Sequence, residues 1–200
     1  MTLNIYTISH PIIQFLASSI INQNTEQNVY EKNCQYIGLL FIYEVLRKYT
    51  KIEELYIKKM YSTKNFYLIN LQTKFYIFTD LSKNYKMVTE IKILLPNIEI
   101  IHIEYRNNDT MNKNTENNIK HIKIKYSNIK IFILDEIVNN EQIIKIIKYL
   151  ETQTKISLNN IILACIACYD DILHKLDNIY PQLKVYTTKI VYRHKQINNN

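Results

Sequence analysis

Two polar turns follow apolar, isoleucine-rich segments, and their residues are the ones whose types and spacing fit ligand chemistry. Asp135 ends the run 129–134, and the polar stretch 139–142 then leads into a helix-period pattern. Tyr105 and Arg106 close an earlier apolar run in the same way. A strand, a short turn and a helix N-terminus make a common phosphate site, because free backbone amides and the helix dipole attract anions. Such turns normally contain glycine, which lets the backbone approach the phosphate, and 139–142 contains none.

The residues of this turn favour another role. Glu141 places a fixed carboxylate in the first helical turn, where the macrodipole favours an anion. Asn139 or Asn140 can cap the helix with its side-chain oxygen. We therefore predict a structural turn that satisfies its own amides instead of holding a ligand.

Other catalytic and metal-binding patterns are missing from the sequence. The five histidines are scattered and show no metal-ligand spacing. Cys165 and Cys168 form a C-x-x-C inside an apolar run, without the second ligand pair that a zinc site needs, so we interpret them as buried structural thiols. Gly38 is the only glycine, which excludes the glycine-rich nucleotide motifs and the G-x-S-x-G elbow. No residue is assigned as catalytic, and no metal site is predicted.

Composition explains the basic charge without a nucleic-acid partner. The formal net charge is +7, and 22 of the 25 basic residues are lysine. Isoleucine, asparagine, lysine and tyrosine abound while glycine, alanine and arginine are scarce, which indicates an AT-rich genome. We therefore expect a plastid-encoded protein or, as the alternative, a cytoplasmic protein of a reduced bacterium. No apolar run approaches the roughly 20 residues of a membrane span, so no membrane association is expected.

Alternating apolar segments predict the elements that position these residues. Strands are predicted at 74–80, 98–105, 129–134, 160–167 and 183–188, and helices from Pro11 and over 30–49, 85–95, 140–152 and 170–179. This alternation predicts an α/β domain with a doubly wound, mainly parallel sheet and a helical N-terminal addition over 1–54. We expect one domain over 1–190 and a frayed tail over 191–200.

Two segments between these elements are predicted from their polarity. Residues 107–118 are rich in asparagine and lack apolar periodicity, so an exposed, mobile loop is expected there. Residues 119–126 alternate apolar side chains with His121, Lys123 and Lys125, as an edge strand does.

The order of several short motifs resembles that of the uracil phosphoribosyltransferases. The matching stretches are HPIIQ (10–14), NQNT (22–25), YEVLR (43–47), LPNIEIIHIEYR (95–106), IFILDEIV (131–138) and PQLKVYTTKI (181–190). The resemblance implies a type I phosphoribosyltransferase fold and a homodimer. For an active member it implies phosphoribosyl pyrophosphate and uracil as substrates, with Mg²⁺. It also implies that Arg106 lies on the diphosphate side and Asp135 near the ribose.

The departures from the family pattern concern the ligand sites. The phosphate turn of the family carries threonine-glycine-glycine-serine, where this chain has Asn140, Glu141, Gln142 and Ile143. The arginine-alanine-glycine that binds pyrophosphate is replaced by Ser82-Lys83-Asn84, and the uracil segment is absent after Ile190. The resemblance therefore implies a vestigial phosphoribosyl-pyrophosphate site, formed by Ser82, Lys83, Arg106, Asp135, Asn140 and Glu141.

Three functions remain open at this point. The first is a catalytically degenerate homologue that acts through structure or partner binding. The second is a working pyrimidine-salvage enzyme that makes uridine monophosphate. The third is an RNA-binding regulator that uses the basic face of His121, Lys123 and Lys125, although the absence of clustered arginines disfavours a nucleic-acid partner.

Overall fold

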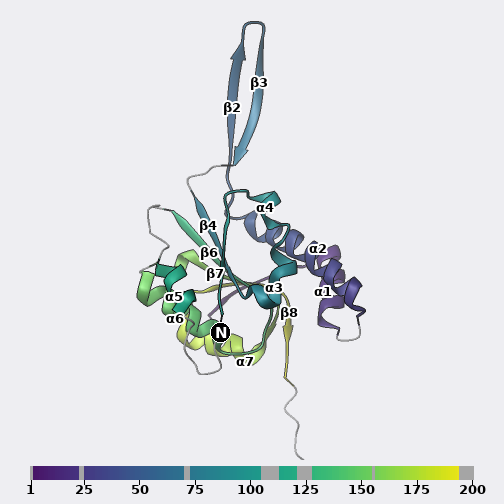
Figure 1. Ribbon diagram of the computed structural model, residues 1–200, viewed down its shortest axis with the longest axis vertical. Coiled ribbons are helices and arrows are strands. Elements are labelled where there is room, and N and C mark those ends of the chain that lie inside the picture. Colours follow the sequence, from purple (N-terminus) through teal and green to yellow (C-terminus); the bar gives the residue numbers. More distant parts are fainter. Residues whose placement is uncertain are drawn as a thin grey trace, which may run out of the picture.

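The core of the protein is a six-stranded parallel sheet. The computed structural model describes residues 2–22, 25–69, 73–104, 113–120, 128–154 and 156–193. The strand order is β1-β8-β7-β6-β4-β5, and every pairing is parallel (Figure 1). The strands are β1 (Asn4–Thr7), β4 (Lys74–Thr79), β5 (Glu99–His102), β6 (Ile129–Val138), β7 (Ile161–Tyr169) and β8 (Lys184–Val191). The predicted doubly wound α/β architecture is confirmed.

Helices cover both faces of the sheet, so two apolar cores form. One face carries α1 (Pro11–Ile21), α2 (Gln27–Leu46), α3 (Leu81–Val88) and α4 (Ile91–Leu94), and the other carries α5 (Lys113–Lys120), α6 (Gln142–Thr154) and α7 (Asp170–Ile179) (Figure 1). A short 3₁₀ turn, Leu158–Asn160, precedes β7. In β7, Leu163 packs into one core and Ala164 into the other, which is why the strand reads as a continuous apolar run.

The single glycine is required by helix packing. Gly38 lies on α2 where the helix crosses α3. A Cβ atom at this position would stand 1.9 Å from the backbone oxygen of Met87. The one glycine of the chain therefore allows two helices to approach closely, and none is present at a turn.

A hairpin projects from the domain at the end of α2. Strands β2 (Ile52–Lys59) and β3 (Ser62–Ile69) pair antiparallel and extend away from the sheet (Figure 1). Almost all of their side chains are exposed, including several large apolar ones. A two-stranded hairpin without a covering layer is only marginally stable in water.

The structure corrects several predicted elements. The first 54 residues are not all helical: β1 adds an edge strand beside β8, and β2 begins at Ile52. The predicted helix 85–95 starts earlier, at Leu81, because Asp80 caps it, and it breaks into α3 and α4. None of the described helices has the length and apolarity that a membrane crossing requires.

The polar segment after β5 also differs from its prediction. Helix α5 occupies 113–120, so the predicted loop is wrong from 113 to 118 and the predicted strand is wrong at 119–120. Buried Ile119 and Thr115 anchor this helix, and Thr115 Oγ1 accepts a hydrogen bond from the Glu104 amide at 3.1 Å. A few buried side chains were sufficient to fix a helix that lacks a visible apolar stripe. Residues 105–112 and 121–126 lie outside the described part of the chain.

Candidate functional site

Asp135 is the centre of the candidate site. Strand β6 continues to Val138, so Asp135 lies inside the strand rather than after it, opposite Cys165 of β7. Its Oδ1 accepts a hydrogen bond from Nδ2 of Asn84 at 3.2 Å. Burial raises the pKa of the Asp135 carboxyl to about 6, although the Asn84 hydrogen bond and the Lys83 charge oppose this shift. This carboxyl is therefore partly protonated near neutral pH.

Asn84 of α3 links the end of β4 to Asp135 of β6. Its side chain is 1% exposed, and Nδ2 also donates to Oγ1 of Thr79 at 3.1 Å. Its Oδ1 is buried and has no hydrogen-bond partner among the described residues. The resemblance implies glycine at this position, where the backbone would approach the pyrophosphate. An amide side chain now fills that position and contacts Asp135.

The N-terminus of α3 satisfies its own amides. Asp80 Oδ1 accepts hydrogen bonds from the amide of Ser82 at 3.0 Å and from its hydroxyl at 2.6 Å. The amides of Lys83 and Asn84 donate to the Asp80 carbonyl, and the Leu81 amide donates to His102 Nδ1 at 3.1 Å. Lys83 Nζ lies 3.8 Å from Asp80 Oδ2. Three amides of the first turn, those of Leu81, Ser82 and Lys83, are thus bonded within the chain and do not face an anion.

The turn between β6 and α6 is capped as predicted. Asn140 Oδ1 accepts a hydrogen bond from the amide of Gln142 at 3.0 Å. Helix α6 begins at Gln142, so Glu141 precedes the helix and does not lie in its first turn as expected. The Glu141 carbonyl accepts from the amides of Ile144 and Lys145. The side-chain cap explains how the turn forms without glycine.

Two cationic side chains from distant elements bind residues of this turn. Lys175 of α7 forms an ion pair with Glu141. Arg193, which follows β8, donates from Nη2 to the carbonyl of Asn139 at 2.9 Å. The Arg193 guanidinium also lies 4.8 Å from the Tyr169 ring centroid, and Nη1 lies 3.4 Å from Asp171 Oδ2. Arg193 thus belongs to an ordered contact network, although 191–200 was predicted to be frayed.

An acidic side chain next to Asp135 faces α2. Oε2 of Glu136 accepts a hydrogen bond from the Tyr30 hydroxyl at 2.5 Å, and Oε1 accepts from Sγ of Cys34 at 3.3 Å. Burial and the nearby Glu136 carboxylate raise the pKa of Cys34 to about 12 and shift the pKa of Tyr30 upward as well. Both groups therefore stay protonated and serve as donors to Glu136.

The structure brings together only part of the predicted site. Ser82 and Lys83 lie at the N-terminus of α3, and Lys83 is near enough to Asp135 to lower its pKa. Asn140 and Glu141 form the separate turn before α6. Arg106, with Tyr105, lies outside the described residues, as do His121, Lys123 and Lys125.

The described carboxylates do not fit a Mg²⁺ site. The Asp135 side chain is partly buried, with a raised carboxyl pKa, and Glu136 already accepts two protein donors. Mg²⁺ requires ionised, accessible oxygen ligands in octahedral geometry. No group of three or more metal-binding side chains occurs in the part of the chain that the structure describes.

Several functional contacts were missed because they join distant segments. Lys175 lies 34 positions along the chain from its partner Glu141, and Arg193 lies 54 positions from its partner Asn139. Glu136 meets Tyr30 across 106 residues. The adjacent acids Asp135 and Glu136 were the one available signal, since two consecutive carboxylates at a strand end need partners when they are buried.

Comparison with known proteins places these features in a family. A uracil phosphoribosyltransferase family model matches residues 7–198. A protein of Porphyra purpurea described as a uracil phosphoribosyltransferase homolog is 27% identical over 191 residues, covering 95% of this chain and 89% of the relative. A protein of Pyropia yezoensis with the same description is 26% identical over 190 residues, with 95% and 89% covered.

A solved structure supports the fold independently. The AQ2163 protein of Aquifex aeolicus superposes with a TM-score of 0.70 at 14% identity, covering 94% of this chain and 88% of that one. This likeness confirms the α/β architecture alone. The family model, which spans nearly the whole chain, shows that this protein belongs to the uracil phosphoribosyltransferase family.

Proposed function

We propose that this protein is a uracil phosphoribosyltransferase homologue without catalytic activity, retained for a structural or partner-binding role. One observation carries the proposal: the amides and charges at both former ligand turns are bonded within the chain. The Asp80 carboxylate accepts a hydrogen bond from the Ser82 amide at the start of α3, and the Asn140 side chain accepts one from the Gln142 amide at the start of α6. Asn84 donates to Asp135, where the family pattern implies a ribose contact.

The energetic cost of these replacements is large. Each lost charge-assisted hydrogen bond to a phosphate removes about 1.5–3 kcal/mol. Glu141 and Gln142 add side-chain bulk where the family has glycine, and Glu141 carries a charge that repels phosphate. Ser82 supplies no charge in place of the family's arginine. At about 1.4 kcal/mol per factor of ten, affinity for phosphoribosyl pyrophosphate falls by several factors of ten.

A direct assay tests the proposal. The purified protein is incubated with uracil, phosphoribosyl pyrophosphate and Mg²⁺, beside an active family member as the positive control. We expect no uridine monophosphate and no calorimetric binding of phosphoribosyl pyrophosphate at sub-millimolar concentration. Turnover that disappears in Asp135→Asn would restore the enzyme interpretation. The double variant Glu141→Gly, Gln142→Gly should also form no uridine monophosphate, because Ser82 still stands where the family pattern has arginine.

The alternative is an active pyrimidine-salvage enzyme. Asp135 is retained, and Lys83 lies close enough to lower its pKa, so one acid and one cation of a working site are present. The protein would then need Mg²⁺, and no group of three or more metal-binding side chains occurs among the described residues. The assay above separates the two interpretations. The RNA-binding hypothesis depends on residues outside the described part of the chain, and no structural observation favours it.

We also propose a plastid origin. The two relatives come from red algae, and the composition is that of an AT-rich genome. Sequencing DNA from isolated plastids and from nuclei of the source organism tests this. We expect the coding sequence in the plastid fraction, and a nuclear gene would contradict the proposal.

A homodimer formed through the hairpin is the third part of the proposal. Leu55, Ile57, Phe66 and Leu68 share one face of β2 and β3, because side chains alternate along a strand, and each is about half exposed. On the same face, Glu53 lies near the base and Lys59 and Lys64 lie toward the tip. Two copies packed antiparallel through this face would oppose unlike charges.

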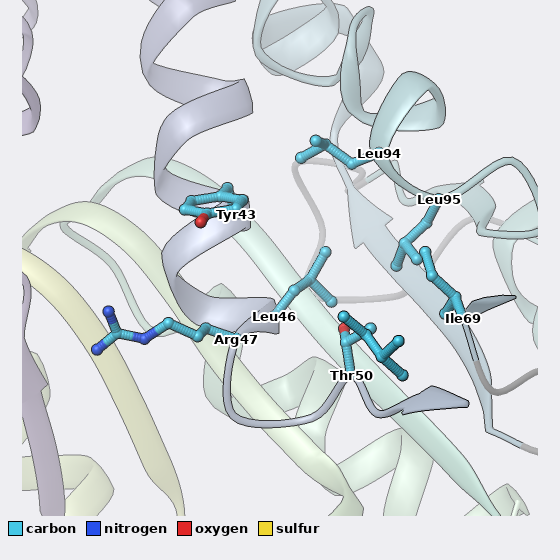
Figure 2. A pocket seen from close by; sticks show the side chains of 8 residues that line it. Tyr43, Leu46, Arg47, Thr50, Ile69, Leu94 and Leu95 are labelled. Atoms are coloured by element: carbon cyan, nitrogen blue, oxygen red, sulfur yellow. The ribbon is translucent and has the colours of Figure 1, made fainter. Parts of the chain in front are cut away.

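A second apolar surface, a hollow at the base of the hairpin, lies on the opposite face, which carries Ile52 and Ile69. It has a volume of about 380 Å³ and is lined mainly by Leu46, Ile69, Leu94 and Leu95 (Figure 2). Exposed apolar surface of this kind marks a protein interface, and a second copy supplies the layer that an isolated hairpin lacks.

Light scattering at micromolar concentration tests the dimer. We expect twice the chain mass of 24.0 kDa. The variant Leu55→Asp, Phe66→Asp should be monomeric, whereas Tyr56→Asp, Tyr67→Asp on the opposite face should remain dimeric. A monomeric native protein would refute this part of the proposal.

A further inference from the structure

A cluster of tyrosines and lysines lies beside the sheet near the end of α2, with Lys130 and Lys184 at the amino ends of β6 and β8. Tyr6 of β1 stacks on Tyr186 of β8 with ring centroids 4.8 Å apart. Tyr49, just after α2, meets Tyr186 edge to face at 6.3 Å, and their hydroxyl oxygens lie 3.2 Å apart. Since one hydroxyl donates to the other, one phenolic proton of this pair stays available for a ligand.

Three lysines surround these rings. Lys130 and Lys184, at the starts of β6 and β8, place Nζ 5.9 Å and 6.0 Å from the Tyr49 ring centroid. Lys48 Nζ lies 4.4 Å from the Tyr6 centroid and donates to the Tyr6 hydroxyl. None of the three forms an ion pair with a carboxylate in the described ranges of the chain. Lys130 does donate to Asn160 Oδ1 at 2.5 Å.

Lys130 and Lys184 repel each other. Burial and the charge of Lys184 lower the pKa of Lys130. Positive charges held together without a carboxylate reduce stability, and an anion that binds between them removes this cost. The tyrosines hold the lysine side chains in place through cation–π contacts.

A hollow touches the edge of the cluster at Tyr6 and Tyr186, although Lys48, Lys130 and Lys184 do not line it. Its volume is about 470 Å³, and Tyr6, His10, Arg47 and Tyr186 lie on its wall. Arg47, just after α2, lines both this hollow and the apolar hollow at the base of the hairpin (Figure 2). Its guanidinium pairs only loosely with Glu44, at 3.5 Å, and is three-quarters exposed.

We propose that Lys48, Lys130 and Lys184, with the hydroxyls of Tyr49 and Tyr186, form a binding site for a small polyphosphate anion. A phosphate chain carries several charges and many acceptor oxygens, so it can contact separate ammonium groups at once, which a single carboxylate does not. Two of its lysines lie at the amino ends of β6 and β8, and the site is independent of whether the candidate site is active.

Inorganic triphosphate is the probe for this site. Calorimetry and thermal unfolding of the full chain should show binding that weakens as the salt concentration rises. The variant Lys130→Gln, Lys184→Gln should bind at least about tenfold more weakly. The control Lys92→Gln, Lys148→Gln changes the net charge equally at two exposed positions and should bind as the native protein does.

Further variants keep the test decisive if the double substitution disturbs folding. Lys48→Gln alters an exposed side chain and should still weaken binding, while Lys184→Arg keeps the charge and should retain most of it. Equal weakening in the control, or no binding by the native protein, would overturn the proposal. Tighter binding of a single-stranded RNA oligomer than of triphosphate, with the same lysine dependence, would also overturn it in favour of a nucleic-acid site.

Discussion

At the carboxyl ends of β4 and β6 the acidic side chains have partners within the chain. Near the amino ends of β6 and β8, by contrast, Lys48, Lys130 and Lys184 surround tyrosines and form no ion pair with a described carboxylate. Asp80, Asp135, Glu136 and Glu141 each accept a donor from a neighbouring element. Parallel α/β sheets bind ligands at their carboxyl ends. Here the polar groups at that end bind one another, and the three lysines without a described ion pair lie nearer the other end.

This difference shows how a ligand site is lost without loss of the fold. A polar turn that no longer binds a ligand still has amides and charges that need partners. Asn140, Lys175 and Arg193 supply them at one turn, and Asp80 and Asn84 at the other. The following predictions test the contrast between the two ends, beginning with the largest effect.

Adding a second acid beside Asp135 should be the most damaging change. Asn84→Asp replaces a donor with a carboxylate about 3 Å from Asp135, in a buried position. We expect the free energy of unfolding to fall by about 3–5 kcal/mol at pH ~8, and by less at pH ~5, where one carboxyl is protonated. Denaturant unfolding measures this. The exposed control Asn28→Asp, in the first turn of α2, should be neutral or slightly stabilising.

The stability of the native protein should decrease between about pH 4 and pH 6 because of Asp135. Its folded-state pKa is raised from 3.8 to about 6, so the folded state holds a proton that the unfolded chain releases. This contribution is complete below the unfolded pKa and is lost as the pH rises through the folded pKa. Asp135→Asn should remove that slope and be more stable by about 2 kcal/mol at pH ~8. If Asp135→Asn has the same dependence of stability on pH as the native protein, Asp135 is already ionised in the folded state over this pH range.

Breaking the ion pair at the carboxyl end should have a modest cost. Lys175→Gln removes the partner of Glu141, and both side chains are about half exposed. We expect a loss of about 0.5 kcal/mol in unfolding free energy, and less at high salt, as for other exposed pairs. A loss above ~2 kcal/mol would mean that the turn depends on this pair more than on the Asn140 cap.

Removing a lysine at the amino end should have the opposite sign. Lys184→Gln relieves the repulsion on Lys130, so stability should rise by up to about 0.5 kcal/mol at low salt and be unchanged at ~1 M salt, where charges are screened within ~3 Å. The pKa of Lys130 should rise, which nitrogen-detected NMR titration can measure. Destabilisation similar to that of Lys175→Gln would abolish the contrast between the two ends.

Much of the fold followed from local sequence. The apolar runs at 129–134 and 160–167 predicted two central strands, and their continuous apolar character reflects burial on both faces. The cap by Asn140 was also predictable, because a side-chain oxygen two residues before an amide is a local arrangement.

The partners of the site residues were decided by tertiary structure alone. Asn84, Lys175 and Arg193 reach Asp135 or its turn from other elements, and no local pattern marks them. The same holds for β1, which needs the edge of β8, and for α5, which depends on buried Thr115 and Ile119. The sequence by itself determined the order and type of most elements, because hydrophobic periodicity and capping act over a few residues. Which charges met partners depended on where the sheet brought distant segments together, because a side chain contacts whatever lies next to it in space, at any separation along the chain.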